Sequence, residues 1–468
     1  MNISSVKHAY VVGAGGISMS AIVKLFLDRG TSVSGFDVIQ SAITDELNSL
    51  GADITTADSG ASLPEGVDLL VYSEAVPEGD SLRAQGREQG IKQMAAAVFW
   101  GEYAKGKKVI AVSGTNGKST TTAMLGLMLE KAGFDPTVVV GTRVLQWDSN
   151  IRIGKSDWLV IEADEYAAKM LNYKPDIAVI TNIAADHLDF YKNEQDIASH
   201  FQKWINAMPL SATVILNRDD ERSALLDAYG RNKRVFGLKG DAGVRAAGIM
   251  QTSGASEWVG SVTFNIVDSE KDWGIVIMRV PGEHTIANAV AAATAADSAG
   301  VPRSIIRAAL SEFSGTWRRF EMVGEYNGAL IVSDYGHHPA GIRATLKAAR
   351  AWYPFRRIVV LFQPHHRNRT KNLFHEFAAA FFRADVVIIS EIYDVSGRED
   401  SGDKDISSKD LAAAIKKAGH KAVSYAKNLD TAESMLKKII QPEDVVIIMG
   451  AGDVDQVARN IAQPYESN

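Results

Sequence analysis

A glycine-flanked lysine followed by hydroxyl residues is the part of the sequence that points most directly to chemistry. After the apolar run KVIAV, the chain contains Gly114, Thr115, Asn116, Gly117, Lys118, Ser119 and Thr120, and then a helix-forming stretch. Glycines let backbone N–H groups close around phosphate oxygens, and a helix start adds partial positive charge. Lys118 would reach the outer phosphates and the Ser119 hydroxyl would coordinate Mg²⁺. Val112 replaces the first glycine of the general pattern. The loop is predicted to bind a nucleoside triphosphate, the alternative being an ordinary strand-to-helix turn.

Acidic residues and a histidine end the next two predicted strands. WLVIEADEY ends in Glu162, Asp164 and Glu165, and VITNIAADHLDFY carries Asp186, His187 and Asp189. The carboxyl ends of parallel strands line one edge of a sheet, where ligands bind. Lys118, Glu162 and His187 are therefore expected to converge, and Ser119, Glu162 and His187 are the predicted metal ligands. A capping or surface role is the alternative for His187.

Arginines and histidines gather further along the chain. The segment FSGTWRRFEMVGE contains Arg318 and Arg319. These arginines are either salt-bridged structural groups or a guanidinium fork for a phosphoryl group. DYGHHP and QPHHRNR then supply Asp334, Tyr335, His337, His338, His365, His366, Arg367 and Arg369. These two sets end different strands without compact metal-ligand spacing, so recognition of carboxylate or phosphate is favoured over a metal site.

The first predicted turn, VVGAGGISMSA, offers a second phosphate site. Ser18 occupies the position of the third glycine in a dinucleotide fingerprint, whereas Asp37 ends the second strand, where a ribose-binding acid would stand. The signal for NAD is weak. A pyrophosphate at a helix start explains the glycines whichever nucleotide carries it.

These motifs need parallel strands to position them, and the chain alternates apolar strands with helices over most of its 468 residues. The fold class is predicted as α/β with three domains. These are an N-terminal Rossmann-like domain over 1–103, a central P-loop ATPase-type domain with a mixed sheet over 104–316, and a C-terminal Rossmann-like α/β domain over 317–468. Alternating patterns around 231–280 suggest antiparallel strands, and 396–405 reads as a polar loop.

Composition excludes several classes of protein. The net charge of −6 argues against a sequence-independent nucleic-acid binder, and zero cysteines exclude disulfides and cysteine nucleophiles. No apolar run is long enough for a signal peptide core or a membrane span, so a cytoplasmic protein with no membrane partner is expected.

Taken together, the motifs resemble the Mur ligase superfamily, the ATP-dependent amide-forming enzymes of cell-wall and folate chemistry. The shortened loop GTNGKSTT, the strand-end glutamate with the Asp-His pair, GEHTIANAV, GTWRRF and DYGHHP with FQPH occur in the family's order over nearly the whole chain. The resemblance implies Lys118, Glu162, His187, Arg319 and Asp334 as catalytic residues.

The resemblance also implies three binding sets. For ATP it adds His284, Asn288, Arg319 and Asp334 to residues 114–120. For a UDP-sugar it implies Gly13, Gly15, Gly16, Ser18, Met19, Ser20, Asp37 and Ser73. For the amino-acid substrate it implies Tyr335, His337, His338, His365, Arg367 and Arg369. The sequence departs from the family pattern at Thr285, Ser333 and His366, and no carbamylated lysine is assigned near Gln202 and Lys203.

The implied reaction joins UDP-N-acetylmuramate to L-alanine, with ATP and Mg²⁺, through an acyl phosphate. The alternative within the family is a murein-recycling ligase that adds L-Ala-γ-D-Glu-meso-diaminopimelate to the same acceptor, which EADEY resembles. A nucleotide-regulated binding protein and an NAD dehydrogenase are alternatives of other classes. The oligomeric state is not predicted.

Overall fold

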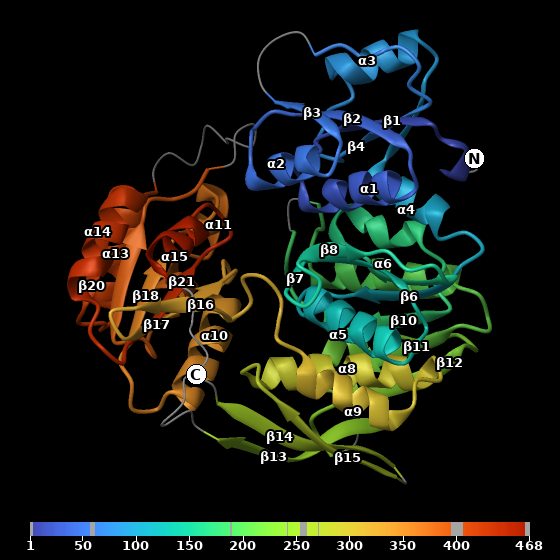
Figure 1. Ribbon diagram of the computed structural model, residues 1–468. Helices are drawn as coiled ribbons and strands as arrows, with labels where there is room; N and C mark the ends of the chain where they lie inside the picture. Colours follow the sequence, from blue (N-terminus) through green and yellow to red (C-terminus); the bar gives the residue numbers. More distant parts are fainter. Residues whose placement is uncertain are drawn as a thin grey trace. The chain divides into compact units, whose positions relative to one another are not determined.

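The computed structural model describes residues 3–56, 61–187, 190–240, 242–252, 260–269, 271–394 and 406–463. Asp189 and the polar loop predicted at 396–405 lie outside the described residues. Three β-sheets with covering helices make up the fold (Figure 1), which confirms the predicted α/β class.

The N-terminal sheet is parallel throughout, as predicted. Its strands are β1 (His8–Val12), β2 (Ser32–Asp37), β3 (Asp53–Thr56), β4 (Leu69–Tyr72) and β5 (Lys92–Ala95), in the order β3-β2-β1-β4-β5. The helices are η1 (Ile3–Ser5), α1 (Ile17–Asp28), α2 (Ala42–Ser49), α3 (Ser81–Glu88) and α4 (Ala96–Tyr103). The strand order reverses between β1 and β4, which is where open α/β sheets bind ligands.

The central sheet has ten strands in the order β15-β14-β13-β12-β11-β10-β6-β9-β7-β8. They are β6 (Lys108–Ser113), β7 (Thr137–Val144), β8 (Ser149–Arg152), β9 (Trp158–Glu162), β10 (Ile177–Ile180), β11 (Thr213–Asn217), β12 (Asn232–Gly237), β13 (Val244–Thr252), β14 (Ser261–Asp268) and β15 (Asp272–Met278). The helices are α5 (Lys118–Lys131), η2 (Tyr166–Asn172), α6 (Glu194–Ala207), α7 (Glu221–Ala224), α8 (Glu283–Ser298) and α9 (Arg303–Glu312).

The antiparallel strands predicted around 231–280 need a correction. β12 pairs in parallel with both β11 and the start of β13. The sequence of β12, NKRVFG, has no regular alternation of polar and apolar residues. The strand extends the parallel part of the sheet by one more strand. β14 and β15 are neighbours in the sheet, and the short link between Asp268 and Asp272 requires antiparallel pairing, because a parallel crossover needs about a dozen residues or more.

The C-terminal sheet follows the predicted strand–helix alternation. Its strands are β16 (Glu321–Tyr326), β17 (Ala329–Asp334), β18 (Ile358–Phe362), β19 (Val386–Ser390), β20 (Val423–Ala426) and β21 (Val445–Met449), in the order β16-β17-β21-β18-β19-β20. The helices are α10 (Pro339–Trp352), α11 (Arg367–Asn372), α12 (Phe374–Ala378), α13 (Ser408–Lys417), α14 (Leu429–Ile439) and α15 (Asp455–Ile461). Only the pair of β16 with β17 is antiparallel among the pairs described for this sheet.

The chain divides into two compact units. One contains Met1–Ala247, Asn265–Ile275 and Ala287–Glu312, and the other contains Gly248–Phe264, Val276–Ile286 and Phe313–Asn468. The first unit therefore holds the N-terminal sheet and most of the central sheet, and the second holds the C-terminal sheet. The predicted boundaries near 103 and 316 stay predictions.

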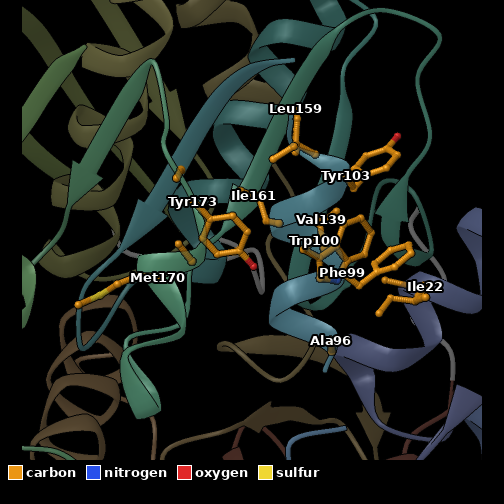
Figure 2. Packing of buried hydrophobic residues seen from close by; sticks show 14 of the residues in the cluster. Ile22, Ala96, Phe99, Trp100, Tyr103, Val139, Leu159, Ile161, Met170 and Tyr173 are labelled. Carbon is orange, nitrogen blue, oxygen red and sulfur yellow. The ribbon is translucent and has the colours of Figure 1, made fainter. Parts of the chain in front are cut away.

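One hydrophobic core runs through both sheets of the first unit, and a smaller cluster that includes Tyr10, Val12 and Leu70 belongs to the N-terminal part alone. Phe99, Trp100 and Tyr103 on α4 are at most 6% exposed and stack edge-on along the helix. Figure 2 shows these rings between Ile22 of the N-terminal part and Val139, Leu159 and Ile161 of the central part. The two sheets of this unit therefore share their interior.

Among the described residues, none of the helices has the length and apolarity needed to cross a membrane.

Candidate active site

Residues 114–117 form the turn between β6 and α5, as predicted. Gly114 and Gly117 have φ angles of 130° and 84°. Those angles lie in a region that side-chain-bearing residues rarely adopt. A Cβ on Gly114 would lie 2.1 Å from Thr181 Oγ1, and a Cβ on Gly117 would lie 2.3 Å from Asn288 Oδ1. Both glycines are thus required by backbone angle and by packing. Gly117 caps α5, so the unpaired N–H groups of that helix start lie at the loop.

The Lys118 ammonium is held inside its own loop. Nζ donates to the carbonyl oxygens of Gly114 and Thr115 at 2.8 and 3.2 Å, and lies 2.7 Å from Glu165 Oε2. Burial alone would lower the pKa of Lys118, but the carboxylates of Glu165, Asp164 and Glu162 outweigh this effect and raise it. Lys118 is therefore a cation at neutral pH.

Glu165, which was named from the sequence without a role, contacts Lys118 and lies near His187. Its side chain is 2% exposed, and Oε1 lies 3.8 Å from His187 Nε2. Burial raises the pKa of Glu165 to about 7, although the nearby Lys118 charge opposes this shift. Glu165 thus lies between two predicted catalytic residues.

The turn that carries Glu165 is strained. Ala167 and Ala168 in this turn have φ angles of 52° and 55°, and His187, in the segment after β10, has a φ angle of 52°. Such a conformation costs roughly 1–2 kcal/mol per non-glycine residue. The Ala168 amide donates to Glu165 O at 2.9 Å, and the Tyr191 hydroxyl donates to the same carbonyl. Strain of this kind persists where surrounding contacts over-determine the backbone, and it concentrates at functional sites.

Glu162 contacts the phosphate loop from the neighbouring strand. Its Oε1 accepts a hydrogen bond from Ser119 Oγ at 3.1 Å, and Oε2 accepts one from the Gly141 amide at 2.6 Å. The structure therefore brings Ser119 and Glu162 together as predicted, whereas His187 lies nearest to Glu165.

Three further side chains hold the loop. Thr181 Oγ1 donates to Asn116 O at 2.7 Å, and Asn182 both donates to that carbonyl and accepts from the Asn116 amide. Asn288 of α8, an implied ATP residue, is 8% exposed and lies against Gly117. Thr181 and Asn182 were not predicted from the sequence. The signal that could have found them is a pair of polar residues directly after the buried strand β10 (Ile177–Ile180).

The first turn gathers most of the implied UDP-sugar residues. The Gly15 amide donates to Asp37 Oδ2 at 2.8 Å, and a Cβ on Gly13 would lie 3.0 Å from Ser73 Cβ. Gly16 caps α1. Gly13, Gly15, Gly16, Asp37 and Ser73 therefore meet at the carboxyl ends of β1, β2 and β4, the ligand-binding edge of such a sheet.

The remaining implied UDP-sugar residues divide between surface and core. Ser18 is exposed. Met19 is 2% exposed within the core, and Ser20 Oγ donates to Ile17 O at 2.9 Å. The Met19 and Ser20 side chains thus support α1, and ligand contacts of these two residues stay predictions.

The paired arginines have different surroundings. Arg318 is 7% exposed, and its guanidinium donates to the carbonyl oxygens of Gly450 and Gly452. Arg319 is exposed, and its guanidinium carbon lies 5.0 Å from the centre of the Tyr335 ring. Arg318 therefore takes the structural role, while Arg319 is the arginine available to a ligand.

Asp334 is buried and engaged. Its Oδ2 accepts from the Phe320 amide at 2.9 Å, and Oδ1 accepts from the Gly336 amide and the Thr345 hydroxyl. The charges of Asp334 and Arg319 act on His284. Although part of its ring is exposed, desolvation by its crowded surroundings and the Arg319 charge lower the pKa of His284, and Asp334 opposes this shift. Three implied ATP residues thus lie together in the second unit.

Stacked rings connect part of the implied amino-acid set. The ring centre of His337 lies 5.1 Å from that of Tyr335 and 6.1 Å from that of His365. The His365 ring stacks on the Tyr393 ring, with 5.6 Å between their centres. Burial, together with the charges of His366, His337, Arg369 and Arg318, lowers the pKa of His365 to about 3. His365 is therefore neutral at physiological pH, and sequence analysis missed its partner Tyr393.

Two other members of this set, His338 and Arg367, have structural partners. His338 Nδ1 accepts from the Ala340 amide at the start of α10, and Arg367 Nε lies 2.7 Å from Asp394 Oδ2. Arg369 lies in the last turn of α11. Roles of these residues toward an amino acid stay predictions.

The departures from the family pattern have local explanations. Thr285 lies in the first turn of α8, where its buried hydroxyl donates to Pro281 O, four residues earlier, at 2.8 Å. Ser333 Oγ donates to Asp455 Oδ1, which places a carboxylate beside the serine. His366 caps α11 with φ of 66°. Gln202 hydrogen-bonds the backbone of Asp227, and Lys203 is exposed.

A separate cavity of about 400 Å³ lies beside β12 and shares no residue with this site. Two of its lining residues, Arg234 and Arg303, form ion pairs with Asp297, and Arg303 also pairs with Asp268. Both arginines are therefore engaged by carboxylates of the protein itself.

Comparison with known proteins follows the same three parts. Models described as the Mur ligase family catalytic domain, the Mur ligase middle domain and the Mur ligase glutamate ligase domain match residues 8–108, 112–296 and 318–452. A protein named UDP-N-acetylmuramate–L-alanine ligase from Desulforapulum autotrophicum is 39% identical over 97% of this chain and 98% of its own. The chain belongs to the Mur ligase family.

Other Mur ligases are similar to this chain over nearly its whole length. A protein of the same name from Geotalea uraniireducens is 36% identical over 99% of both chains. The crystal structure of UDP-N-acetylmuramate–alanine ligase from Thermotoga maritima has a TM-score of 0.82 at 27% identity, covering 97% of this chain and 98% of the other. A murein peptide ligase from Psychrobacter arcticus has a TM-score of 0.69 at 22% identity over the same shares, which supports the fold.

The oxygen donors at the phosphate loop suit a magnesium ion that is bound partly by the protein and partly by waters and substrate phosphates. Among the described residues, no group of three or more acidic or histidine side chains could enclose a metal. Mg²⁺ usually takes one or two carboxylates plus waters and substrate phosphates. Ser119 and Glu162, 3.1 Å apart, fit that partial set.

Proposed function

We propose that this Mur ligase joins the lactyl carboxylate of UDP-N-acetylmuramate to the amine of L-alanine, using ATP and Mg²⁺, in peptidoglycan precursor synthesis. The observation that carries the proposal is the 39% identity, over 97% of the chain, to a protein named for that reaction. The phosphate loop with Lys118, Ser119 and Glu162 in contact supplies the matching chemistry. A cytoplasmic location belongs to the proposal, because ATP is supplied inside the cell.

The reaction needs activation because a carboxylate oxygen is a poor leaving group. The substrate carboxylate attacks the γ-phosphorus of ATP, which releases ADP and gives an acyl phosphate. The alanine amine then attacks the acyl carbon, phosphate leaves, and the amide forms with loss of a proton. Magnesium bound by Ser119 and Glu162 would neutralise charge on the phosphates.

The chain's own groups have defined tasks in this scheme. Lys118 exchanges its ion pair with Glu165 for the outer phosphates, and the N–H groups at the start of α5 bind phosphate oxygens. Arg319 is proposed to stabilise the transferring phosphoryl group. Because acyl phosphates hydrolyse readily, the site must exclude water during the reaction.

The murein-recycling alternative shares the acceptor and differs in the amine. The full-length relatives named for L-alanine favour the amino acid over the tripeptide. A nucleotide-regulated binding protein and an NAD dehydrogenase explain less, because neither needs the acid, histidine and lysine gathered at the 114–120 loop.

The decisive assay measures phosphate release from ATP with UDP-N-acetylmuramate and one amine at a time. L-Alanine is expected to give release together with a new amide detected by mass spectrometry, and L-Ala-γ-D-Glu-meso-diaminopimelate is expected to give little. Preference for the tripeptide would establish the recycling reaction instead, and release without any amine dependence would reject a ligase.

Lys118→Ala is expected to abolish this turnover with the fold intact, because the phosphates lose their cation. Circular dichroism checks the fold. Lys203→Ala, the same change at an exposed position on α6, is the matched control and is expected to retain activity. Near-normal ligation by Lys118→Ala would contradict the proposed role.

A further inference from the structure

A ring of contacts among four charged residues, closed on one side by the Arg318 backbone amide, adjoins the turn that carries Arg319. The Arg318 amide donates to Glu321 Oε2 at 2.8 Å, and Arg459 binds both Glu321 oxygens at 2.8 and 2.7 Å. Arg459 Nε also donates to Asp455 Oδ2 at 3.2 Å, and Asp455 Oδ1 lies 4.0 Å from Arg318 Nε. The arginine–carboxylate ring of Arg318, Glu321, Asp455 and Arg459 contains two positive and two negative charges.

The turn that adjoins this ring is strained. Arg318 and Phe320 have φ angles of 57° and 48°, where non-glycine residues are disfavoured. Hydrogen bonds fix its backbone, because the Phe320 amide donates to Asp334 and the Tyr335 amide donates to Arg318 O. A backbone of this kind keeps its shape only while its surroundings over-determine it.

Arg318 ties the turn to the loop before α15. Its guanidinium is 7% exposed and binds two carbonyl oxygens there, yet a buried guanidinium needs a carboxylate to offset its desolvation. Burial lowers the pKa of Arg318, and among the opposing charges Asp455 acts most strongly. Asp455 is itself 8% exposed and is oriented by the Ser333 hydroxyl.

We propose that Asp455 is a positioning residue for the ligase reaction: by pairing with Arg318 it holds the 318–320 turn in the shape that exposes Arg319. This inference rests on the proposed function. The carboxylate comes from the last helix of the chain, and it contacts β17 through Ser333, next to Asp334.

Asp455→Asn tests the inference with two readouts. Turnover in the alanine-dependent assay is expected to fall between about tenfold and the roughly hundredfold that a misplacement of 1 Å can cost. Hydrogen–deuterium exchange in peptides covering 316–322 is expected to accelerate. Asp430→Asn, the same charge change at an exposed position on α14, is expected to alter neither.

Two double variants separate positioning from general destabilisation. The double variant Ser333→Asp with Asp455→Ser exchanges the hydroxyl and the carboxylate of the Ser333–Asp455 hydrogen bond. This variant is expected to recover most of the lost turnover and of the lost protection from hydrogen exchange. In an Arg319→Ala background, Asp455→Asn is expected to cause no further loss of turnover, because the group it positions is gone.

Wild-type turnover and exchange in Asp455→Asn would overturn the inference, and so would losses that add to those of Arg319→Ala. If wild-type protein releases no phosphate with any amine, the proposed function fails. The exchange measurement still decides whether Asp455 orders the turn.

Discussion

Lys118 and Glu165 show how single residues at a site are constrained by groups that the local sequence does not reveal. The loop GTNGKST announces a phosphate site by itself, since glycine spacing and a lysine are local features. The choice of Glu165 as the lysine's partner depends on the strained turn at Ala167 and Ala168. No periodicity predicts that turn, which explains why Glu162 alone was assigned from the sequence.

Gly117→Ala is expected to weaken MgATP binding by at least about tenfold, which corresponds to 1.4 kcal/mol. The added Cβ would lie 2.3 Å from Asn288 Oδ1 in a backbone with φ of 84°. Titration calorimetry measures the affinity. Gly133→Ala is the control, because φ is 78° there but nothing lies within 4 Å of the new Cβ. Equal effects of the two variants on binding would show that packing against Asn288 is irrelevant.

His365 gives the protein an acid-sensitive group. Its pKa is about 3 in the folded protein, whereas the ordinary value for a histidine is 6.5, so below pH 6.5 the unfolded chain binds a proton that the folded chain does not. The free energy of unfolding therefore falls as pH falls from 6.5 toward 3. When the pH falls from 6.5 to 5, the free energy of unfolding of His365→Asn is expected to decrease by up to about 2 kcal/mol less than that of the wild type.

Urea unfolding at the two pH values measures this difference. His375→Asn, which changes an exposed histidine on α12, is the control and is expected to keep the wild-type pH dependence. An unchanged pH dependence in His365→Asn would mean that His365 does not contribute it.

At the scale of elements, strands and loops were predictable wherever the signal is local. Runs such as VIAV, WLVIE and VVIIM are buried parallel strands, and polar residues at their ends mark the binding edge. Contacts between distant segments were not predictable. Asn288 lies against Gly117, and Asp455 lies against Arg318, each over more than 100 positions along the chain. The parallel pairing of β12 was missed because its sequence lacks a clear period.

The segment that follows β10 supports the phosphate loop through Thr181. Thr181→Val keeps the shape of the side chain but removes the hydroxyl that donates to Asn116 O and Ser113 O. An unmade buried hydrogen bond costs about 1–3 kcal/mol. The KM for ATP is expected to rise roughly tenfold, since 1.4 kcal/mol is a factor of ten. Steady-state kinetics measures it, and Thr213→Val on β11 should leave KM unchanged. Unaltered KM in Thr181→Val would show that the Thr181 hydroxyl does not organise the loop.

At the scale of the whole molecule, the first unit behaves as one body because the aromatic residues of α4 serve both of its sheets (Figure 2). Phe99 packs against Phe26 at 5.3 Å between ring centres, and Trp100 against Tyr103 at 5.6 Å. The N-terminal range that the sequence suggests as a domain therefore shares part of its interior with the central range.

Trp100→Ala is expected to lower the free energy of unfolding by about 3–5 kcal/mol, as the deletion of a buried aromatic ring does. Hydrogen exchange is expected to accelerate together in β1, β4, β6 and β9, because all four strands contribute to the shared core. Trp352→Ala, at a residue 1% exposed in the C-terminal core, is the control. That variant should accelerate exchange in β17 and β18 instead. Loss of protection confined to β1 and β4 in Trp100→Ala would contradict a shared core.

The common interior also limits how this chain can be cut or recombined. A fragment that starts near residue 104 would expose the faces of Leu159 and Ile161 that α4 normally covers, and exposed apolar patches of that kind promote aggregation. Chimaeras between Mur ligases should therefore exchange the first two sheets as one block, with crossover points placed after α9.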